Sequence, residues 1–436
     1  MLAGRSKIDI TPSTSVGMDG MIRAHGSEGI HDPIHVRAIV IGNTESPSDT
    51  FALISVDICG MMTSDYSRTR KLVSEATGIP ISQIVIAATH THSGPAAYGF
   101  FDKKETEYVE DMINRIVQCS DEAFRFRVPA FVSAASGIED TISNYRRLMS
   151  KSGKVIMNWE PYDPADIVGP LGIEDTEVGV LLFISSQSGQ PVAVFFNHAG
   201  HPNVMSGDNY LISGDYVGFA ETRLEKDLSC VCAFFNGAQG TMDIDGLKDR
   251  DWDGVERAGG ALAKAVKTTI KSCPTPADAI IRSESVTFPV PIRKISDEEY
   301  EWACDIWEKC GGKLQPVADG VGDDYKAMLY KKLRESSETQ IMLEMTCIAI
   351  GDTALLSFPG ELFTEIGQVI KKNSPFTHTY IIGIANGCEG YFPTRQAISE
   401  GGYAEDTRQI DADTEDIVLR ESAALLNKTF SNPHYS

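Results

Sequence analysis

Two histidines at alternate positions mark the stretch of this chain that is best suited to bind a metal ion. Residues 89–95 read Thr-His-Thr-His-Ser-Gly-Pro and place His90 and His92 directly after the apolar run 84–88. The run predicts a short buried strand, and side chains two positions apart in an extended segment lie on one face. Imidazole nitrogens are frequent zinc ligands. The stretch alone leaves open both a metal site and a strand end that is merely polar.

Ligand-capable side chains also follow the ends of other predicted strands. His198 and His201 follow one apolar run, and Glu361 follows another through a Pro-Gly pair. A hydrolytic zinc ion needs three protein ligands and an open position, and His90, His201 and Glu361 would supply such a set. Their wide separation in the sequence means that spacing lends this set little support. Glu361 could instead stabilise the first turn of a helix, and His198 could be a hydrogen-bonded loop residue.

The predicted elements repeat one pattern three times: two strands joined by a short turn, then a helix, then a further strand. The predicted bounds are 35–41, 51–57, 64–75 and 84–88 in the first unit, 178–184, 192–197, 215–226 and 231–236 in the second, and 345–350, 354–358, 361–372 and 379–384 in the third. The strands are apolar throughout, so both of their faces need cover. The sequence therefore predicts an α/β (mixed α+β) fold of mixed β-sheets with helical cover, built from three hairpin-helix-strand units.

The domain organisation predicted from the sequence is simple. We expect a single catalytic domain over residues 1–436, because no stretch is linker-like enough to mark a boundary. Residues 297–338 are highly charged, helical in pattern and interrupted by glycines, which predicts a solvated helical insertion or lid. The tail after Ile417 predicts one amphipathic helix that docks on the body.

Charge and cysteine usage limit the partners and the location. A formal net charge of −22 disfavours nucleic acid and anionic membranes as partners. The first residues lack the apolar core of a secretory signal, and no apolar run is long enough to cross a bilayer. The nine cysteines include no Cys-x-x-Cys pair, unlike a disulfide framework or a four-cysteine zinc site. We expect a cytoplasmic protein without a transmembrane segment, and the oligomeric state stays open.

The histidine stretch and several other segments resemble one known family. Residues 89–95 are similar to the Thr-His-Thr-His-Ser-Gly-Pro element of the neutral/alkaline, non-lysosomal ceramidases. Residues 7–12, 201–218, 358–361 and 391–405 resemble further elements of that family, in the same order along the chain. The resemblance implies a zinc-dependent hydrolase that cleaves a linear N-acyl amide bond with metal-activated water. Its substrate would be a small-molecule or lipid amide.

The same resemblance implies a set of site residues. Carried over position by position, the zinc ligands would be His90, His201, Glu361 and Tyr391. His92 and Tyr403 would contact the substrate or the developing oxyanion, and one arginine of the pair at 146–147, which we take to be Arg146, would contact the substrate. A tyrosine ligand is chemically reasonable because a bound Zn²⁺ favours the phenolate far below the ordinary pKa of about 10.

The chain also departs from the family pattern, and these departures concern the substrate. We expect no C-terminal β-sandwich domain, although ceramidases of this family usually carry one. The family's Gly-Asp-x-Ser/Asn-Pro element reads Gly-Thr-Met-Asp-Ile-Asp at residues 240–245, with the acidic pair Asp243 and Asp245. The arginine pair also differs from the family arrangement. The sequence therefore supports the amide chemistry more strongly than it supports ceramide as the substrate.

Other readings of the sequence stay open. The chain could be a zinc hydrolase of a small polar amide, lactam or ester, or a non-catalytic binding protein that retains the fold. A hydrolase with a serine or cysteine nucleophile is less favoured, because the sequence has no Gly-x-Ser-x-Gly elbow and no cysteine adjoins the histidine strands. Asp57, at the end of a predicted strand, could orient a ligand histidine or could simply cap the strand.

Overall fold

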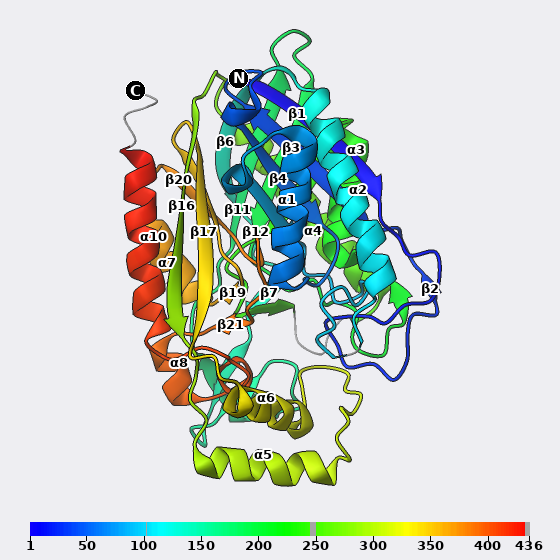
Figure 1. Cartoon of the computed structure of the whole chain (residues 1–436), viewed down its shortest axis with the longest axis vertical. Helices are drawn as coiled ribbons and strands as arrows, with labels where there is room; N and C mark the ends of the chain where they lie inside the picture. Colours follow the sequence, from blue (N-terminus) through cyan, green and yellow to red (C-terminus); the bar gives the residue numbers. More distant parts are fainter. Residues whose placement is uncertain (102, 245–249, 432–436) are drawn as a thin grey trace.

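Two β-sheets packed face to face form the centre of the molecule, and helices cover both outer faces (Figure 1). The computed structural model describes residues 1–101, 103–244 and 250–431. The larger sheet has the order β14-β12-β11-β6-β1-β3-β4-β5, and the smaller has the order β16-β17-β18-β20. This four-layer arrangement confirms the predicted class of mixed sheets with helical cover.

The strands of the larger sheet are β1 (Leu2–Asp9), β3 (His35–Gly42), β4 (Thr50–Val56), β5 (Ile84–Ala88), β6 (Val128–Ile138), β11 (Glu177–Ser185), β12 (Pro191–His198) and β14 (Val231–Asn236). Those of the smaller sheet are β16 (Ile281–Pro291), β17 (Gln340–Ile350), β18 (Thr353–Ser357) and β20 (His378–Ile382). Their facing sides share one apolar core, in which Leu53 and Phe195 pack together with Tyr380 and Ile382. Burial on both faces explains why the strand sequences are apolar throughout.

The main helices form the two outer layers. They are α1 (Thr63–Thr77), α2 (Thr106–Arg125), α3 (Asp215–Leu228), α4 (Trp252–Ser272), α7 (Thr364–Lys372) and α10 (Thr414–Phe430). Helices α1 and α2 cover one half of the larger sheet, and α3 and α4 cover the other half. Helices α7 and α10 cover the smaller sheet. Helix α10 is the predicted docked tail helix.

The three predicted units are present, and all three have the same connectivity. In each unit the first two strands pair antiparallel and the last strand pairs parallel with the middle one: β3, β4 and β5, then β11, β12 and β14, then β17, β18 and β20. A helix connects each parallel pair, as a parallel pair requires. The middle and last strands of every unit therefore end at the same edge of their sheet, which gathers the residues that follow them.

One predicted boundary in the third unit is wrong, and the difference matters for the site. Helix α7 begins at Thr364, three residues after the predicted start at Glu361. Residues Glu361–Leu362 form the short strand β19, which pairs parallel with β21 (Tyr391–Phe392). The N–H of Glu361 donates to Gly390 O at 2.8 Å, so its backbone is extended by a tertiary partner. Glu361 therefore does not lie in the first turn of a helix.

The charged segment near residues 297–338 contains two helices, α5 (Asp297–Lys309) and α6 (Asp323–Glu335). Helix α5 begins with a capping box, in which Ser296 and Glu299 bond each other's backbone N–H. The two helices share a small apolar cluster that includes Ala303 and Ala327. Figure 1 shows the pair beyond the strand ends of both sheets. No helix among the described residues is both long enough and apolar enough to cross a membrane.

The remaining elements are short. They are β2 (Gly29–Ile30), β7 (Ser143–Tyr145), β8 (Arg147–Ser150), β9 (Val155–Met157), β10 (Ile167–Pro170), β13 (Leu211–Ile212), β15 (Met242–Ile244), α8 (Arg395–Glu400), α9 (Tyr403–Asp406) and the 3₁₀ turns Pro47–Asp49, Ile81–Gln83 and Pro164–Asp166. Several of them pair across long sequence distances, as β15 does with β7 and β13 with β2. These small pairings surround the edge at which the main strands end.

Candidate active site

Three buried side chains that follow different strands meet at this edge. His90 follows β5, His201 follows β12 and Glu361 follows β18, and their ligand atoms all lie within 4.8 Å of one another. Glu361 Oε2 is 3.1 Å from His201 Nε2 and 3.5 Å from His90 Nε2. The structure thus brings together the three residues proposed from the sequence as a ligand set, although they lie far apart in the chain.

The backbone of His90 turns its ring toward the cluster. Strand β5 ends at Ala88, and His90 has a φ of 74°, in the left-handed region that residues other than glycine seldom adopt. The N–H of His90 donates to Ile58 O at 2.9 Å, which holds this turn. His92 returns to the same place, with its Nε2 3.3 Å from Nε2 of His90. The rings of His90 and His92 meet as predicted. The left-handed turn at His90 brings them together, and not the alternation of side chains along a strand.

Asn236, the last residue of β14, joins the two histidine loops. Its side-chain amide donates to Thr89 O at 3.3 Å and to Gly200 O at 2.8 Å, and its Oδ1 accepts from the N–H of Gly200 at 3.2 Å. The residue is completely buried, so these bonds form away from water, where they are strong. The positions just before His90 and His201 are thereby fixed relative to each other.

Backbone carbonyls select the tautomer of both histidines. His90 Nδ1 is 2.7 Å from Cys59 O, and His201 Nδ1 is 2.7 Å from Met242 O. A carbonyl oxygen only accepts hydrogen bonds, so each Nδ1 carries a proton and each Nε2 faces Glu361. Histidine ligands of metal ions are oriented in this way. Two imidazole nitrogens and a carboxylate oxygen, all buried, form a donor set that fits zinc.

Tyr391 stands beside Glu361 because the two short strands pair. In the parallel pair of β19 and β21, Glu361 is directly opposite Tyr391. The guanidinium carbon of Arg146 lies 4.8 Å from the ring centroid of Tyr391 and 5.5 Å from that of Tyr403. Nη1 of Arg146 is 3.5 Å from Nε2 of His201. The residues that the family resemblance named therefore lie in one cluster, and all of them except the half-buried Tyr403 are buried.

The two neighbouring arginines have different surroundings. Arg146 faces the cluster, and its Nε and Nη2 are buried without a hydrogen-bond partner among the described residues. Arg147 turns the other way and pairs with Glu405 at 2.6 Å and with Glu400 at 3.0 Å. It also donates to Gly401 O at 3.2 Å, and thereby holds the segment that carries Tyr403. The choice of Arg146 as the site arginine is consistent with this geometry.

Burial and neighbouring charges set the protonation of the cluster. Burial, together with His90 and His201, holds the pKa of His92 well below its ordinary value, so its ring is neutral at pH 7. Burial acts to raise the pKa of Glu361, but the two histidines outweigh it and hold this pKa well below its ordinary value. Burial and Glu361 raise the pKa of Tyr391. The phenolate ligand implied by the resemblance therefore requires a cation that offsets Glu361.

Two other residues singled out in the sequence have partners away from the cluster. His198 is buried, with Nδ1 3.0 Å from Glu177 O, which fits a hydrogen-bonded loop residue. Asp57 does not orient a ligand histidine. Its Oδ2 accepts from Nη1 of Arg37 at 3.0 Å and from the N–H of His35 at 2.8 Å. Asp57 thus belongs to a buried ion pair, and the carbonyl oxygens of Cys59 and Met242 orient the two histidines in its place.

The altered segment at residues 240–245 borders the cluster on the side of Arg146. Asp243 is buried and lines a polar chamber of about 20 Å³ together with Arg146, His201 and Asp319. That volume is about the space of one water molecule. Asp245, the second member of the acidic pair, lies outside the described residues. The substitution of the family element therefore changes the charge directly beside the site.

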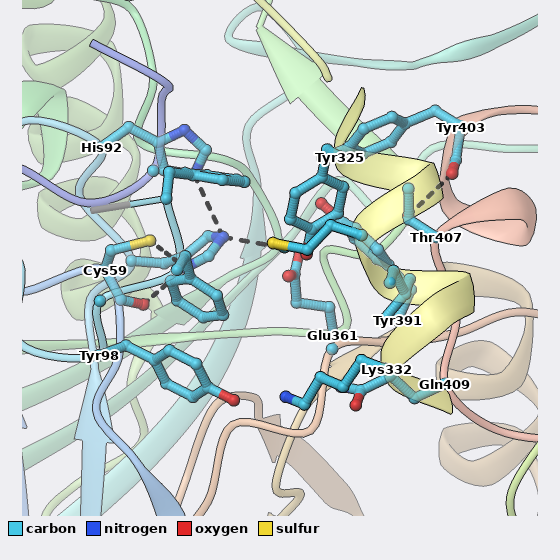
Figure 2. A pocket seen from close by; sticks show the side chains of 18 residues that line it. Cys59, His92, Tyr98, Tyr325, Lys332, Glu361, Tyr391, Tyr403, Thr407 and Gln409 are labelled. Atoms are coloured by element: carbon cyan, nitrogen blue, oxygen red, sulfur yellow. Dashed lines mark hydrogen bonds and ion pairs between the residues drawn. The ribbon is translucent and has the colours of Figure 1, made fainter. Parts of the chain in front are cut away.

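A cavity of about 310 Å³ opens on the other side of the cluster. His92, Glu361 and Tyr403 line its inner end, and helix α6 forms one wall (Figure 2). The remaining lining is largely aromatic or aliphatic and includes Phe100, Phe101, Tyr325, Met328 and Leu329. Cavities that bind small organic ligands have this size and composition. The predicted insertion thus contributes directly to the wall of the candidate active site.

Sequence reasoning missed a cysteine in the cluster. Cys59 follows β4 by a few residues, and its Sγ lies 3.5 Å from Nδ1 of His90. Burial and the nearby Asp19 raise the pKa of this thiol well above its ordinary value, so Cys59 is not an activated nucleophile. Cys59 follows a strand end, as the other reactive side chains do, and this pattern would have identified it. Cys59 does not adjoin the histidine stretch in the sequence, so it was not recognised there.

The chain is similar to known neutral ceramidases in sequence and in structure. No protein-family model matches the chain. Neutral ceramidase B of Dictyostelium discoideum is 25% identical over 218 residues, which are 46% of this chain and 28% of that protein. Neutral ceramidase of Pseudomonas aeruginosa is 27% identical over 237 residues, which are 52% of this chain and 34% of that protein. The matched segments thus span about a third of the length of these curated relatives.

The structural similarity extends over nearly the whole chain. The crystal structure of neutral ceramidase from Pseudomonas aeruginosa superimposes with a TM-score of 0.75 and 19% identity, covering 98% of this chain and 74% of that one. A structure of a ceramidase complexed with C2 gives the same TM-score of 0.75 and covers 75% of that chain. At this identity the superposition shows the fold. Together with the sequence matches, it shows that this chain is similar to the neutral ceramidases and shares the fold of the one from Pseudomonas aeruginosa.

Proposed function

We propose that this chain is a zinc-dependent hydrolase that cleaves a linear N-acyl amide bond. The observation that carries the proposal is the convergence of His90, His201 and Glu361 beside an apolar cavity, with both histidine Nε2 atoms directed at the carboxylate. These three residues would hold the ion, and Tyr391 would complete the set. A bound zinc ion would supply Lewis-acid polarisation of the carbonyl and a water molecule of lowered pKa.

The residues around the ligands suit the remaining tasks of amide hydrolysis. His92 is neutral at pH 7, so it can accept a proton from the attacking water and deliver it to the leaving nitrogen. The hydroxyl of Tyr403 and the unpartnered N–H groups of Arg146 can donate to the oxyanion that develops on the carbonyl oxygen. Amide cleavage needs both functions because the amine is a poor leaving group unless it is protonated.

The cavity supports an amide substrate with an apolar part of moderate size. Its volume of about 310 Å³ lies at the lower end of the range for ligand cavities, roughly 300–1,000 Å³. This favours a smaller amide over a lipid with two long chains. The related proteins are named for ceramide, but the changed charge at Asp243 lies beside the reacting groups. We therefore propose the reaction class without assigning ceramide as the substrate.

The experiment that tests this function is turnover by the zinc-loaded protein across N-acyl amides of increasing acyl length, ceramide included. We expect chelation to abolish turnover and added zinc to restore it, and we expect Glu361→Gln to be inactive. A kcat/KM that rises through long acyl chains would assign a lipid amide, whereas turnover of short amides only would assign a small-molecule amidase. Turnover that survives chelation, or no turnover with zinc bound, would contradict the proposal.

A further inference from the structure

The wall of the candidate active-site cavity includes a cation. Among the described residues, the lining contains Lys332 of helix α6 but no other lysine or arginine, and Glu361 is its only carboxylate. Glu361 belongs to the candidate metal cluster at the inner end. Figure 2 shows Lys332 near Tyr98 and Gln409, at the end of the cavity away from His92 and Tyr403. The two ends of the cavity therefore differ in charge and in chemistry.

The side chain of Lys332 is exposed, and its ammonium group differs from the other basic groups of α6. The other basic side chains of α6 are all paired: Lys326 with Asp406 at 3.0 Å, Lys331 with Glu335 at 3.1 Å, and Arg334 with Asp297. Among the described residues, no hydrogen bond or ion pair is found for the ammonium of Lys332. The protein has a formal net charge of −22, so partners for a lysine are abundant. A lysine left unpaired on an otherwise paired helix is available to a ligand.

The opposite wall adds a hydrogen-bond donor. Figure 2 shows Lys332 and Tyr98 reaching toward each other across the cavity. Burial raises the pKa of Tyr98 above its ordinary value, so its hydroxyl keeps its proton and can donate. Tyr98 is held in place because Asp19 accepts the N–H groups of Tyr98, Gly99 and Phe100 at 2.8, 3.1 and 3.0 Å. A charged donor and a neutral donor on facing walls are suited to an anionic acceptor.

The section between the two ends is apolar. Tyr98 stacks on Phe100 with ring centroids 3.8 Å apart, and Phe101 packs edge-on against Tyr325 at 5.2 Å. Met328 of α6 lies in the same wall. A bound molecule that fills the cavity therefore contacts the proposed metal ligands at one end, aromatic side chains along its length and a cation at the other end. Apolar contact gives the affinity in such cavities, and a few polar groups fix the orientation.

We propose that Lys332 makes the enzyme selective for amides that carry an anionic group, such as a carboxylate, separated from the scissile bond by an apolar segment. The proposal rests on the amidohydrolase function above and specifies its substrate class. The anion can belong to the acyl part or to the amine part, because either part can occupy the cavity. A neutral ceramide lacks such a group and would leave Lys332 unpaired.

Matched substrates test this selectivity. On the acyl side, the para-nitroanilide of octanoic acid is compared with the mono-para-nitroanilide of octanedioic acid. On the amine side, N-acetyloctylamine is compared with N-acetylaminooctanoic acid. We expect kcat/KM to be higher for the carboxylate member of at least one pair. Lys332→Gln should remove that preference, a loss of about tenfold that appears in KM, as for a charge-assisted hydrogen bond.

Lys331→Gln is the matched control. Lys331 is the next residue of the same helix, it is paired with Glu335, and it does not line the cavity. This variant should keep the wild-type kcat/KM for both members of each pair, and with it the full preference for the carboxylate substrate. Equal turnover of both members of each pair by the wild type would overturn the proposal, and so would a preference that survives Lys332→Gln.

A binding measurement separates this proposal from the proposed function. Calorimetric titration of the zinc-free protein with octanoate and with octanamide does not depend on catalysis. We expect octanoate to bind more tightly, and Lys332→Gln to weaken octanoate binding several-fold while octanamide is unaffected. If octanoate binding is independent of Lys332, the proposal fails even if amides are hydrolysed. If binding depends on Lys332 but no amide is hydrolysed, the anion site stands and the proposed reaction fails.

Discussion

His90 combines an unfavourable backbone conformation with a side chain that is directed at the cluster. Its backbone occupies the left-handed region at a φ of 74°, which costs a histidine conformational energy. In return its Nε2 points at Glu361 while its Nδ1 reaches the carbonyl of Cys59. Buried hydrogen bonds from neighbouring segments hold the conformation. Strain that is maintained in this way is common where a side chain must be aimed at a site.

The proposed metal-binding role of Glu361 gives the first prediction. Glu361→Gln keeps the side chain's shape but removes the charge, so zinc affinity should fall by at least the roughly 10–100-fold that changes around metal ligands cause. Competition with a chromogenic chelator measures this affinity directly. His198→Asn is the control, because His198 is equally buried but bonds Glu177 O outside the cluster. Unchanged zinc affinity in Glu361→Gln would contradict the assignment.

A second prediction at this scale concerns pH. Burial, only partly offset by Arg147, raises the pKa of Glu405 from 4.5 to about 7. The folded protein therefore binds more protons at this site than the unfolded chain between these pH values, so its contribution to stability falls as pH rises through about 7. The free energy of unfolding of wild type minus that of Glu405→Gln should decrease by about 1–3 kcal/mol over this range.

Urea unfolding of the two proteins at a series of pH values measures this difference. Glu335→Gln serves as the comparison, because Glu335 is exposed and the lysine and tyrosine beside it lower its pKa. The free energy of unfolding of wild type minus that of Glu335→Gln should not decrease as pH rises toward 7. A difference between wild type and Glu405→Gln that increases with pH would show that the ion pair with Arg147 dominates over burial.

At the scale of elements, a short strand pair and helix α6 complete the candidate site. The pair β19–β21 sets Glu361 opposite Tyr391, and the two-helix segment supplies α6 as a cavity wall. Helix α6 packs mainly on α5, with Ala303 and Ala327 in their shared core. The wall that contacts the substrate can therefore vary without disturbing the sheets. Whether the segment moves as a lid stays a prediction.

Tyr325 tests the role of α6 as a wall. Tyr325→Ala removes apolar contact with the substrate and with Phe101, so kcat/KM should fall by about tenfold for substrates with an apolar chain and less for acetamides. Zinc affinity should stay unchanged. Tyr300→Ala, in the partner helix α5 and outside the cavity lining, should keep wild-type kinetics. Equal effects of both variants would mean that the helices act only through stability.

At the scale of the whole molecule, buried charges join separate units of the fold. Arg37 on β3 bonds Asp57 after β4, and it also bonds Glu221 and Glu225 of α3 at 2.6 and 2.9 Å. The guanidinium is almost completely buried. This group connects the first unit to the helix of the second, on the side of the larger sheet that faces α3. The site depends on the connection because its histidines come from these two units.

Replacing Arg37 should therefore destabilise the molecule as a whole. Arg37→Met leaves the buried carboxylates of Asp57 and Glu221 without a counter-charge, whereas Glu225 keeps its pair with Lys7, and the loss costs about 3–5 kcal/mol. Chemical denaturation measures the loss, and zinc affinity reports whether the histidine loops are still aligned. Arg68→Met is the control, because the pair of Arg68 with Glu110 is exposed and should contribute little. A loss similar to that of the control would mean that the network is replaceable.

The sequence determined the repeated architecture and singled out residues that the fold brings together in one cluster. Alternation of apolar strands with amphipathic helices defined three units, because burial on both faces leaves a clear record in composition. Once the apolar strands were located, the histidine, glutamate and tyrosine residues that follow them could be recognised as well. The expected cytoplasmic location stays a prediction.

Only the tertiary structure decided how those residues meet. The left-handed turn at His90, the extended backbone at Glu361 and the approach of Cys59 all depend on hydrogen bonds or contacts with distant segments. Local sequence cannot specify such contacts, so it predicted strand alternation at His90 and a helix start at Glu361. The unpaired state of Lys332 is likewise a property of the folded surface, because pairing depends on which carboxylates the fold brings near it.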